Sequence, residues 1–422
     1  MNKTLFQWIA YFRNKVTGWL KLQQSARQQP TQQQPEQPNP VKSRVASLLV
    51  QMEEFMKHRY EFRYNTLKED VEYQEKRLPA NGFAPLDELS LNSIALNALA
   101  ENIPLWDRDV KRYIFSDRIP RYSPIDAYIR ELPTWDGTDH IRRLADSLPC
   151  DNPEWRNQFY IWFLSMVAHW LGMDEMHANS VSPLLVGKQG CGKSTWCRNL
   201  LPPELLEYYT DSIDFSNKRH AELLLNRFAL INIDEFDSIS PSHQAFMKHI
   251  LQKPVVNTRQ AYKRSIRPLK RYASFIATSN NSDLLSDPTG SRRFICIELT
   301  GSIDHALQPD HRQLFAQAVT ALQNNERYWF TPEEEKLIIC NNCRFQQIPI
   351  EEQLFFEYFR LPESGEKGDL LSAAEILRRI EQRSKIKSSI RNMALFGRLL
   401  LKNNVTKKHT KTGNYYHVIE LA

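Results

Sequence analysis

Cysteines are scarce in this sequence, and long apolar runs are absent. Six cysteines are spread over 422 residues, too few and too scattered for the disulfide framework of a small secreted domain. Cys340 and Cys343 have the spacing of half a zinc site, but no second CxxC or HxxxH follows, so we predict no metal there. No apolar run reaches the roughly 18 residues of a membrane-spanning helix, and charges interrupt the apolar N-terminus, which argues against a cleavable signal peptide. We therefore expect a cytoplasmic protein.

The composition is that of an ordinary globular protein, with 41% hydrophobic and 25% charged residues. It excludes wholesale disorder and the fibrous classes. The length allows roughly two to four domains. A net charge of +6 favours an acidic partner only weakly, so the distribution of charge along the chain is more informative.

Composition and hydrophobic periodicity divide the chain into segments. Residues 1–22 predict an amphipathic helix, which could lie on a membrane surface, dock on a partner protein or pack on the chain's own fold. After residue 150, strand and helix patterns alternate, which indicates a parallel α/β sheet. The predicted segments are the amphipathic helix (1–22), a Gln- and Pro-rich linker (23–40), a helical lead-in domain (41–149), the α/β domain (150–330), a helical connector (331–368) and a C-terminal domain (369–422).

A glycine-rich segment follows the apolar run of residues 181–186 and precedes a predicted helix. It reads GKQGCGKS and fills the pattern GxxxxGK[ST] without a gap. Glycines let backbone N–H groups turn towards phosphate oxygens, and the helix N-terminus adds a favourable dipole. Lys193 would reach the β- and γ-phosphates, and the Ser194 hydroxyl would bind Mg²⁺. We predict that ATP is held by Gly187, Lys188, Gln189, Gly190, Cys191, Gly192, Lys193, Ser194 and Thr195.

An acidic pair ends the next apolar run, FALINI. Asp234 is placed to hold Mg²⁺ through its water shell, and Glu235 can polarise the water that attacks the γ-phosphate. A surface acidic pair after a core strand is the alternative. The agreement of strand, spacing and glycine-rich loop favours the catalytic interpretation.

Polar and basic residues follow a third apolar run, YASFIAT. Asn280, near the end of that predicted strand, can hydrogen-bond both the γ-phosphate and the attacking water. Arg292 and Arg293 then precede the apolar run FICIEL. An arginine fork matches the charge that develops on a transferring phosphoryl group, and a neighbouring subunit can supply it. The alternative for this pair is a basic surface patch.

The order of these elements, from SPIDAYIRELPTWDGTDHIRRL to DPTGSRRFICIEL, resembles the virulence-associated protein E family of P-loop ATPases over about residues 123–300. That family is similar to superfamily 3 helicases of the AAA+ class and occurs in phages and bacterial mobile elements. The resemblance implies a ring-forming ATPase, which we expect to be a hexamer, in DNA replication or mobilisation. It places the nucleotide loop on residues 187–195, the acids at Asp234 and Glu235, the sensor at Asn280 and the finger at Arg292 or Arg293.

The sequence departs from many members of that family in one respect. Those relatives carry a primase-like domain ahead of the ATPase, whereas here a short helix and a Gln-rich linker precede it. We therefore expect no priming activity. A separate primase, where one is needed, could dock on the amphipathic helix.

A basic insert lies between the acidic pair and the Asn280 strand, in the segment RQAYKRSIRPLKR. In superfamily 3 enzymes this position holds a β-hairpin that enters the ring channel. Six cations beside Tyr262 suit the phosphates and bases of single-stranded DNA, although a solvated charge run is the alternative. The predicted DNA contacts are Arg259, Lys263, Arg264, Arg267, Lys270 and Arg271.

The C-terminal segment resembles a winged helix. Ser372 and Glu375 predict a capped helix, a second helix follows, and two β-prone stretches flank a turn at residues 412–414. A basic face would suit duplex DNA, but such modules also bind proteins. The cations of that face are Arg391, Arg398, Lys402, Lys407, Lys408 and Lys411.

These observations favour an ATP-driven DNA motor that acts as a ring on single-stranded DNA. A first alternative is a nucleotide-switch ATPase or regulator that assembles without translocating. A small-molecule kinase would need an acceptor pocket and seldom needs adjacent acids, so it is disfavoured. The intact Lys193, Asp234 and Glu235 argue against a binding module that does not hydrolyse nucleotide.

Overall fold

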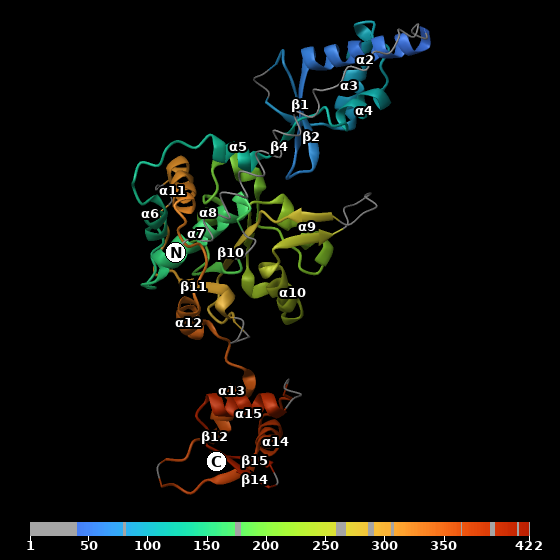
Figure 1. Ribbon diagram of the computed structural model, residues 1–422. Coiled ribbons are helices and arrows are strands. Elements are labelled where there is room, and N and C mark those ends of the chain that lie inside the picture. Colours follow the sequence, from blue (N-terminus) through green and yellow to red (C-terminus); the bar gives the residue numbers. More distant parts are fainter. Residues whose placement is uncertain are drawn as a thin grey trace, which may run out of the picture. The chain divides into compact units, whose positions relative to one another are not determined.

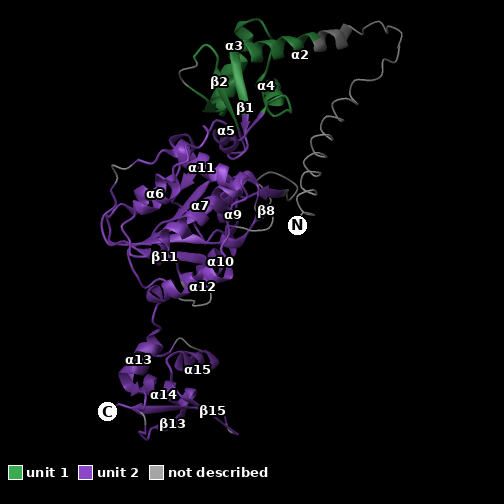
Figure 2. Ribbon diagram, turned by 60° about the vertical axis from the view of Figure 1, so that its left-hand side comes forward, with its two compact units in different colours: residues 1–63, 71–120 green, residues 64–70, 121–422 purple. Residues whose placement is uncertain are grey.

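The structure is a computed structural model of the 422-residue chain. It forms two compact units, Met1–Arg63 with Val71–Pro120, and Tyr64–Asp70 with Arg121–Ala422 (Figure 2). The predicted N-terminal helix and all but the last residue of the predicted linker lie outside the described residues. Those described are 40–78, 82–173, 179–258, 267–285, 291–304, 308–363, 365–388, 393–411 and 413–421.

The first unit combines helices with short strands (Figure 1). Tyr60 and Phe62 alternate on β1 and are buried, as expected for a strand with one covered face. The prediction of a helical domain over 41–149 is therefore wrong in two respects, because part of this stretch is β-structure and residues 121–149 belong to the second unit. Six-residue strands are too short to stand out against a helical periodicity. The elements are α2 (Pro40–Arg59), β1 (Tyr60–Asn65), β2 (Asp70–Glu75), β3 (Ala84–Pro85), α3 (Glu88–Ala100) and α4 (Asp107–Ile114). The sheet order is β3-β2-β1-β4, and β4 (Arg121–Tyr122) and its partners Tyr64 and Asn65 of β1 belong to the second unit.

A five-stranded sheet forms the centre of the second unit, in the order β11-β5-β10-β7-β6. Every neighbouring pair is parallel, which confirms the predicted parallel sheet. All residues of β5, β7 and β10 are buried, as expected for parallel strands that are covered on both faces. The strands are β5 (Ser182–Val186), β6 (Tyr209–Thr210), β7 (Leu230–Ile233), β10 (Ser274–Ser279) and β11 (Phe294–Glu298).

Helices cover the two faces of this sheet. Leu185 joins a cluster with Trp162 of α7 and Phe315 of α11, whereas its neighbour Leu184 joins a second cluster with Leu224 of α9 and Ile250 of α10. The alternation of the strand side chains thus supplies two separate cores. The helices are α5 (Pro124–Arg130), α6 (His140–Asp146), α7 (Trp155–Leu171), α8 (Lys193–Arg198), α9 (Lys218–Arg227), α10 (Pro241–Gln252), α11 (His311–Gln323) and α12 (Pro332–Asn341), with short 3₁₀ turns η3 (Pro203–Tyr208), η4 (Phe236–Ser238), η5 (Ser291–Arg293) and η6 (Asn342–Phe345).

A two-stranded antiparallel sheet lies between β7 and β10 in the sequence. It pairs β8 (Val255–Thr258) with β9 (Arg267–Lys270). This is the segment in which the sequence predicts a basic β-hairpin, and the connection between the two strands, residues 259–266, lies outside the described part.

The C-terminal domain has its own core and begins earlier than predicted. Leu354 and Phe355 of α13 pack with Ile376, Phe396 and Val418, so α13 belongs to this domain and not to a connector. The first part of the predicted connector, α12, instead contributes Ile338 to the core beside the central sheet. The apolar spacing of a helix does not reveal which of two cores it fills. The elements are α13 (Ile350–Tyr358), β12 (Phe359–Arg360), β13 (Asp369–Ser372), α14 (Ala373–Ser384), α15 (Met393–Lys402), β14 (Lys407–Thr410) and β15 (Gly413–Glu420).

The start of α14 agrees with the sequence, because the Ser372 side chain accepts a hydrogen bond from the Glu375 N–H at 3.2 Å. None of the helices in the described part of the chain combines the length and apolar character that crossing a bilayer requires.

Candidate active site

The glycine-rich loop connects β5 to α8 at the edge where the parallel strands end. Gly190 and Gly192 have φ angles of +80° and +97°, a left-handed conformation that favours glycine. A Cβ added at Gly190 would meet nothing within 4 Å, whereas one at Gly187 would lie 3.2 Å from the Leu299 Cβ. Gly190 therefore leaves open space beside the backbone, and Gly187 permits close packing on the residue that follows β11.

Lys193, the first residue of α8, is 7% exposed and turns back over the loop. Its Nζ donates to the carbonyls of Gly187 at 2.6 Å and Lys188 at 3.0 Å, and to the Asn280 Oδ1 at 3.0 Å. These three acceptors are neutral, so they satisfy the N–H groups without compensating the positive charge. A buried ammonium in such surroundings gains most from an anionic ligand.

Asp234 directly follows β7 and contacts the first turn of α8 and the end of β10. Its Oδ1 accepts hydrogen bonds from the Ser194 Oγ at 3.3 Å and from the Thr278 Oγ1. The two residues predicted to bind Mg²⁺, Ser194 and Asp234, are therefore in contact. Hydroxyl and carboxylate oxygens are the ligands that this ion prefers. Thr278 was not among the site residues predicted from the sequence.

Glu235 follows Asp234 in a left-handed backbone conformation, with a φ of +49°. A non-glycine residue adopts this conformation at a cost and commonly at a functional site. Its side chain is exposed and lines the same cavity as Asp234. The Asp234 carboxylate is thus hydrogen-bonded to its neighbours, while the Glu235 side chain is exposed in the cavity.

Asn280 extends from the end of β10 and is flanked by two residues that bind Asp237. The Ser279 Oγ donates to the Asp237 Oδ1 at 2.7 Å, and the Asn281 Nδ2 donates to the Asp237 Oδ2 at 2.6 Å. Asp237 lies in η4, two residues after Glu235. This carboxylate therefore ties the segment after β7 to the segment after β10.

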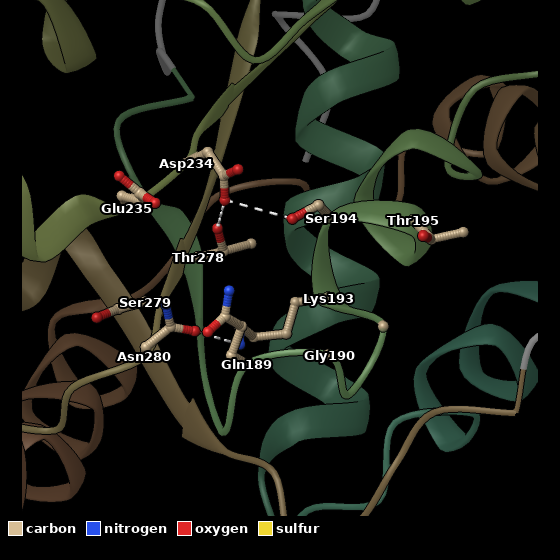
Figure 3. A pocket seen from close by; sticks show the side chains of 11 residues that line it. Gln189, Gly190, Lys193, Ser194, Thr195, Asp234, Glu235, Thr278, Ser279 and Asn280 are labelled. Carbon is tan, nitrogen blue, oxygen red and sulfur yellow. Dashed lines mark hydrogen bonds between the residues drawn. The ribbon is translucent and has the colours of Figure 1, made fainter.

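These groups surround one polar cavity of about 360 Å³. Figure 3 shows the Ser194 and Thr278 hydroxyls directed at Asp234, and Lys193 beside Asn280. The volume falls within the roughly 300–1,000 Å³ of small-molecule sites. The lining residues are Gln189, Gly190, Gly192, Lys193, Ser194, Thr195, Asp234, Glu235, Thr278, Ser279 and Asn280.

Three predicted loop residues do not line this cavity. Gly187 and Lys188 contribute only carbonyls to Lys193. Cys191 is 8% exposed, and its carbonyl accepts a hydrogen bond from the Ile303 N–H at 3.0 Å. Its role in this chain is to pack the loop against the segment after β11.

The two predicted finger arginines lie in η5 and do not reach the cavity of their own chain. The Arg292 Nη1 bonds to the Glu335 Oε2 of α12 at 2.8 Å, and the Arg292 side chain is 46% exposed. The Arg293 Nη2 donates to the Gln252 Oε1 at the end of α10 at 3.1 Å. Arg292 is therefore the more accessible of the two.

Some of the predicted DNA-contact residues lie outside the described part of the chain, and others contact groups of their own chain. Arg259, Lys263 and Arg264 lie outside the described residues, as does the side chain of Arg267. The Lys270 Nζ donates to the Trp170 carbonyl at 2.7 Å, near the end of α7. This bond directs Lys270 into its own chain.

Arg271 is not a DNA contact, because its side chain is 0% exposed. Its guanidinium donates to the carbonyls of Leu251 and Lys253 at 2.9 Å each, and to the Ala273 carbonyl at 2.7 Å. It therefore binds the carbonyl groups at the end of α10. A run of cations in the sequence does not distinguish a solvated arginine from one that satisfies buried carbonyls.

The residues that sequence reasoning missed are Thr278, Ser279 and Asp237. Thr278 and Ser279 are small polar residues at the end of a strand that was already predicted, whereas Asp237 lies in the turn η4. The carboxyl ends of parallel strands meet at one edge, so Thr278 and Ser279 could have been grouped with Asn280 and Asp234.

Residues 129–347, just over half of the chain, match the family described as the virulence-associated protein E-like domain. The chain belongs to this family. Residues 348–418 match a second family, described only as a domain of unknown function from B. theta (DUF3874), and this match begins close to α13. The VapE-like match thus covers the central sheet and the cavity.

Solved structures with similarity to this VapE-like chain have low sequence identity. The apo structure of the NrS-1 C-terminal region is 11% identical, with a TM-score of 0.44, and the match covers 89% of this chain and 99% of that one. The structure named "SCCmec type IV Cch - active helicase" is 12% identical, with a TM-score of 0.39, and the match covers 85% of this chain and 92% of that one. No curated protein matches the chain.

Proposed function

We propose that this protein is an ATP-hydrolysing motor that acts on DNA as a ring oligomer. The observation that carries the proposal is the convergence of Lys193, Ser194, Asp234 and Asn280 on one cavity at the carboxyl edge of a parallel sheet. An ammonium, a hydroxyl, a carboxylate and an amide at these positions are the groups that P-loop ATPases use. Membership of the VapE-like family supports this interpretation.

The residues of the cavity fit ATP and Mg²⁺. The Lys193 ammonium has neutral acceptors that a phosphate oxygen can replace, and Gly190 leaves open space beside the loop. Ser194 and Asp234 would hold the metal ion, and the loop N–H groups would face the phosphates. Bound ATP with its metal supplies a γ-phosphoryl group whose charge is already partly neutralised.

Glu235 is the base in this proposal. Its exposed carboxylate lies next to Asp234 and can accept a hydrogen bond from a water molecule in the cavity. Asn280 can donate from its amide to the same water while its Oδ1 holds Lys193. Asp234 is occupied by Ser194 and Thr278, so the two adjacent acids have separate roles.

A neighbouring subunit would complete the site with Arg292. This side chain lies outside its own cavity and is half-exposed, which suits a group that acts across an interface. We propose a ring, with a hexamer as the expected form. The basic segment 259–266, between β8 and β9, would contact single-stranded DNA in this ring, since its cations suit a phosphate backbone.

A titration of ATP hydrolysis with DNA tests this proposal. The full chain is assayed for phosphate release at several salt concentrations, without DNA, with single-stranded DNA and with duplex DNA. We expect stimulation by the single strand that weakens as salt rises, because phosphate contacts release counterions. Equal rates with and without DNA at low salt, together with no retention of DNA, would reject the motor.

A nucleotide switch and a motor predict different experimental outcomes. A switch predicts oligomers that depend on ATP but no strand separation, whereas a motor separates a labelled strand from a forked duplex. Measuring both on one preparation distinguishes the two functions. Release of free phosphate without an added acceptor would also exclude a small-molecule kinase.

A further inference from the structure

The C-terminal domain has a chain order that is found in DNA-binding modules. It runs from α13 through β13, α14 and α15 to the hairpin β14–β15, and β15 pairs antiparallel with both β13 and β14. Two helices, α14 and α15, pack with the sheet through the core that contains Ile376, Phe396 and Val418. A helix pair followed by a β-hairpin is the arrangement of a winged helix-turn-helix unit.

Charge is segregated within this domain. Residues 385–419, which include α15 and nearly all of the hairpin, contain no Asp or Glu. The acidic residues lie outside this segment, and several pair locally, such as Glu366 with Arg360 at 2.6 Å and Glu420 with Arg379 at 2.6 Å. The cations of the acid-free segment are Lys385, Lys387, Arg391, Arg398, Lys402, Lys407, Lys408 and Lys411.

Four of these eight cations are shown to be free to meet an external anion. Within the described part of the chain, Arg398, Lys407, Lys408 and Lys411 are exposed and form no ion pair with a carboxylate. Lys402 lies 3.9 Å from the Glu352 carboxylate and is also exposed. Arg391 lies outside the described residues. The surface therefore carries uncompensated positive charge on two elements.

Close packing holds these two elements together. A Cβ added at Gly397 of α15 would collide with the Tyr416 hydroxyl of β15, so the helix lies directly on that strand. Lys407 is the cross-strand partner of Tyr416. Directly paired residues share a face of a sheet, which puts Lys407 on the side that packs against α15. The hairpin lysine and the helix thus belong to one rigid surface.

We propose that α15 and the hairpin β14–β15 bind duplex DNA, with the exposed face of α15 in the major groove and the hairpin lysines on the phosphates. The outward face of α15 carries Leu395, Arg398 and Lys402, while Phe396 and Leu400 fill the core. An α-helix fits the major groove, and the cations match the duplex charge density.

Duplex DNA fits this surface better than a single strand does. Single-strand sites combine cations with aromatic side chains on which bases stack. Here Phe396 and Tyr416 are 0% and 4% exposed and belong to the core. Tyr415 is partly exposed, but it pairs with Lys408 on the opposite face of β15. The face shared by α15 and Lys407 therefore offers a helix and cations in place of stacking platforms.

The inference does not depend on ATP turnover, so its failure is distinguishable from failure of the proposed motor. The test measures binding of the full chain, without nucleotide, to a fluorescent 30-bp duplex and to a 30-nucleotide single strand over a range of salt. Lys407→Ala/Lys411→Ala is compared with wild type. The control is Lys367→Ala, an exposed lysine of the same domain outside the acid-free segment.

We expect the double variant to weaken duplex binding several-fold and to lower the slope of log affinity against log salt by about 2, because each phosphate contact contributes close to one unit. Single-strand binding and the Lys367→Ala control should remain at wild-type values. Arg398→Ala should also weaken duplex binding without changing ATP hydrolysis in the absence of DNA. If the double variant binds the duplex with the wild-type affinity and slope, the proposal is overturned. A protein partner is then the alternative ligand of this surface.

Discussion

The Ser279 hydroxyl donates a hydrogen bond of 2.7 Å to the Asp237 carboxylate, and this bond fixes the residue that precedes Asn280. The other Asp237 oxygen accepts from Asn281, so both neighbours of Asn280 are held by one side chain. Asp237 itself lies just beyond Glu235. The two groups that we assign to the attacking water are thereby connected through a single carboxylate outside the cavity lining.

Replacing Asp237 tests this connection. We expect Asp237→Ala to lower kcat for ATP hydrolysis by about 10- to 100-fold with little change in KM, since hydrogen bonds to a charged group contribute about 1.5–3 kcal/mol. Asp237→Asn keeps one acceptor and should recover part of the loss. Steady-state kinetics at saturating DNA measure both constants. The control is Asp283→Ala, an exposed aspartate shortly after Asn281.

A purely structural role of Asp237 would give a different result. In that case KM and thermal stability would change together with kcat, and Asp237→Asn would not differ from Asp237→Ala. Equal turnover of all variants would show that the contacts to Ser279 and Asn281 do not orient Asn280.

Glu235→Gln should separate binding from hydrolysis. The amide keeps the shape of the side chain but cannot accept the proton of the attacking water, so turnover should fall by about 10²- to 10⁴-fold. Binding of a fluorescent ATP analogue should remain near wild type. Lys193→Ala should instead lose binding, because the ammonium is the cation that the glycine-rich loop holds. Retained turnover in Glu235→Gln would assign the base to another residue.

Arg292 should act across a subunit interface. Arg292→Ala alone should lower turnover by about 10³-fold or more, the effect of removing an arginine finger. Mixing Arg292→Ala with Lys193→Ala should restore part of the activity, because some interfaces then combine an intact loop with an intact Arg292. Glu335→Ala, which releases Arg292 from its ion pair, serves as the control and should remain active. No recovery at any mixing ratio would contradict action in trans.

The central sheet was predictable from sequence because its determinants are local. The runs SPLLV and FALINI are apolar except for one polar residue each, which is typical of parallel strands covered on both faces, and the motif residues follow them directly. Parallel pairing then brings Ser194, Asp234 and Asn280 to one edge without further information. The contact of Asp237 with β10 was not predictable in this way, because it depends on the turn η4.

The errors arose where burial decides the role of a residue. Arg271 has the same sequence context as its basic neighbours, yet its guanidinium satisfies the carbonyls of Leu251 and Lys253 inside the fold. The apolar residues of α13 likewise predict a helix but do not show that Phe355 packs with Phe396. Hydrophobic periodicity predicts that one face of a helix is buried, but it does not predict which element packs against that face.

Arg271→Met should therefore destabilise the fold. The change leaves several buried carbonyls without their donor, which costs at least about 2–3 kcal/mol. For a domain of this size we expect the melting temperature to fall by roughly 5–10 °C. Differential scanning fluorimetry measures it, with Lys270→Met as the partly exposed control. An unchanged melting temperature together with loss of single-stranded DNA binding would return Arg271 to the DNA interface.

His169 on α7 should make the stability of the second unit depend on pH. It is 0% exposed, and its Nε2 accepts a hydrogen bond from the Asn179 N–H at 2.9 Å, which requires the neutral ring. Burial, reinforced by the charge of Arg271, lowers the pKa of His169 to about 3, from an ordinary value of about 6.5. The unfolded chain therefore binds a proton below pH 6.5 that the folded chain does not.

The sign of the effect follows from this difference in bound protons. The contribution of His169 is fully present above pH 6.5 and is lost as the pH falls towards 3, with a slope of at most about 1.4 kcal/mol per pH unit. Melting temperatures between pH 7.5 and 4.5 measure it, and His169→Gln should show a shallower decline than wild type, since it cannot take up the proton. The carboxylates contribute equally to both proteins, so the difference between the two curves isolates the imidazole. Parallel curves would show that His169 is protonated in the fold or reached by solvent well above pH 3.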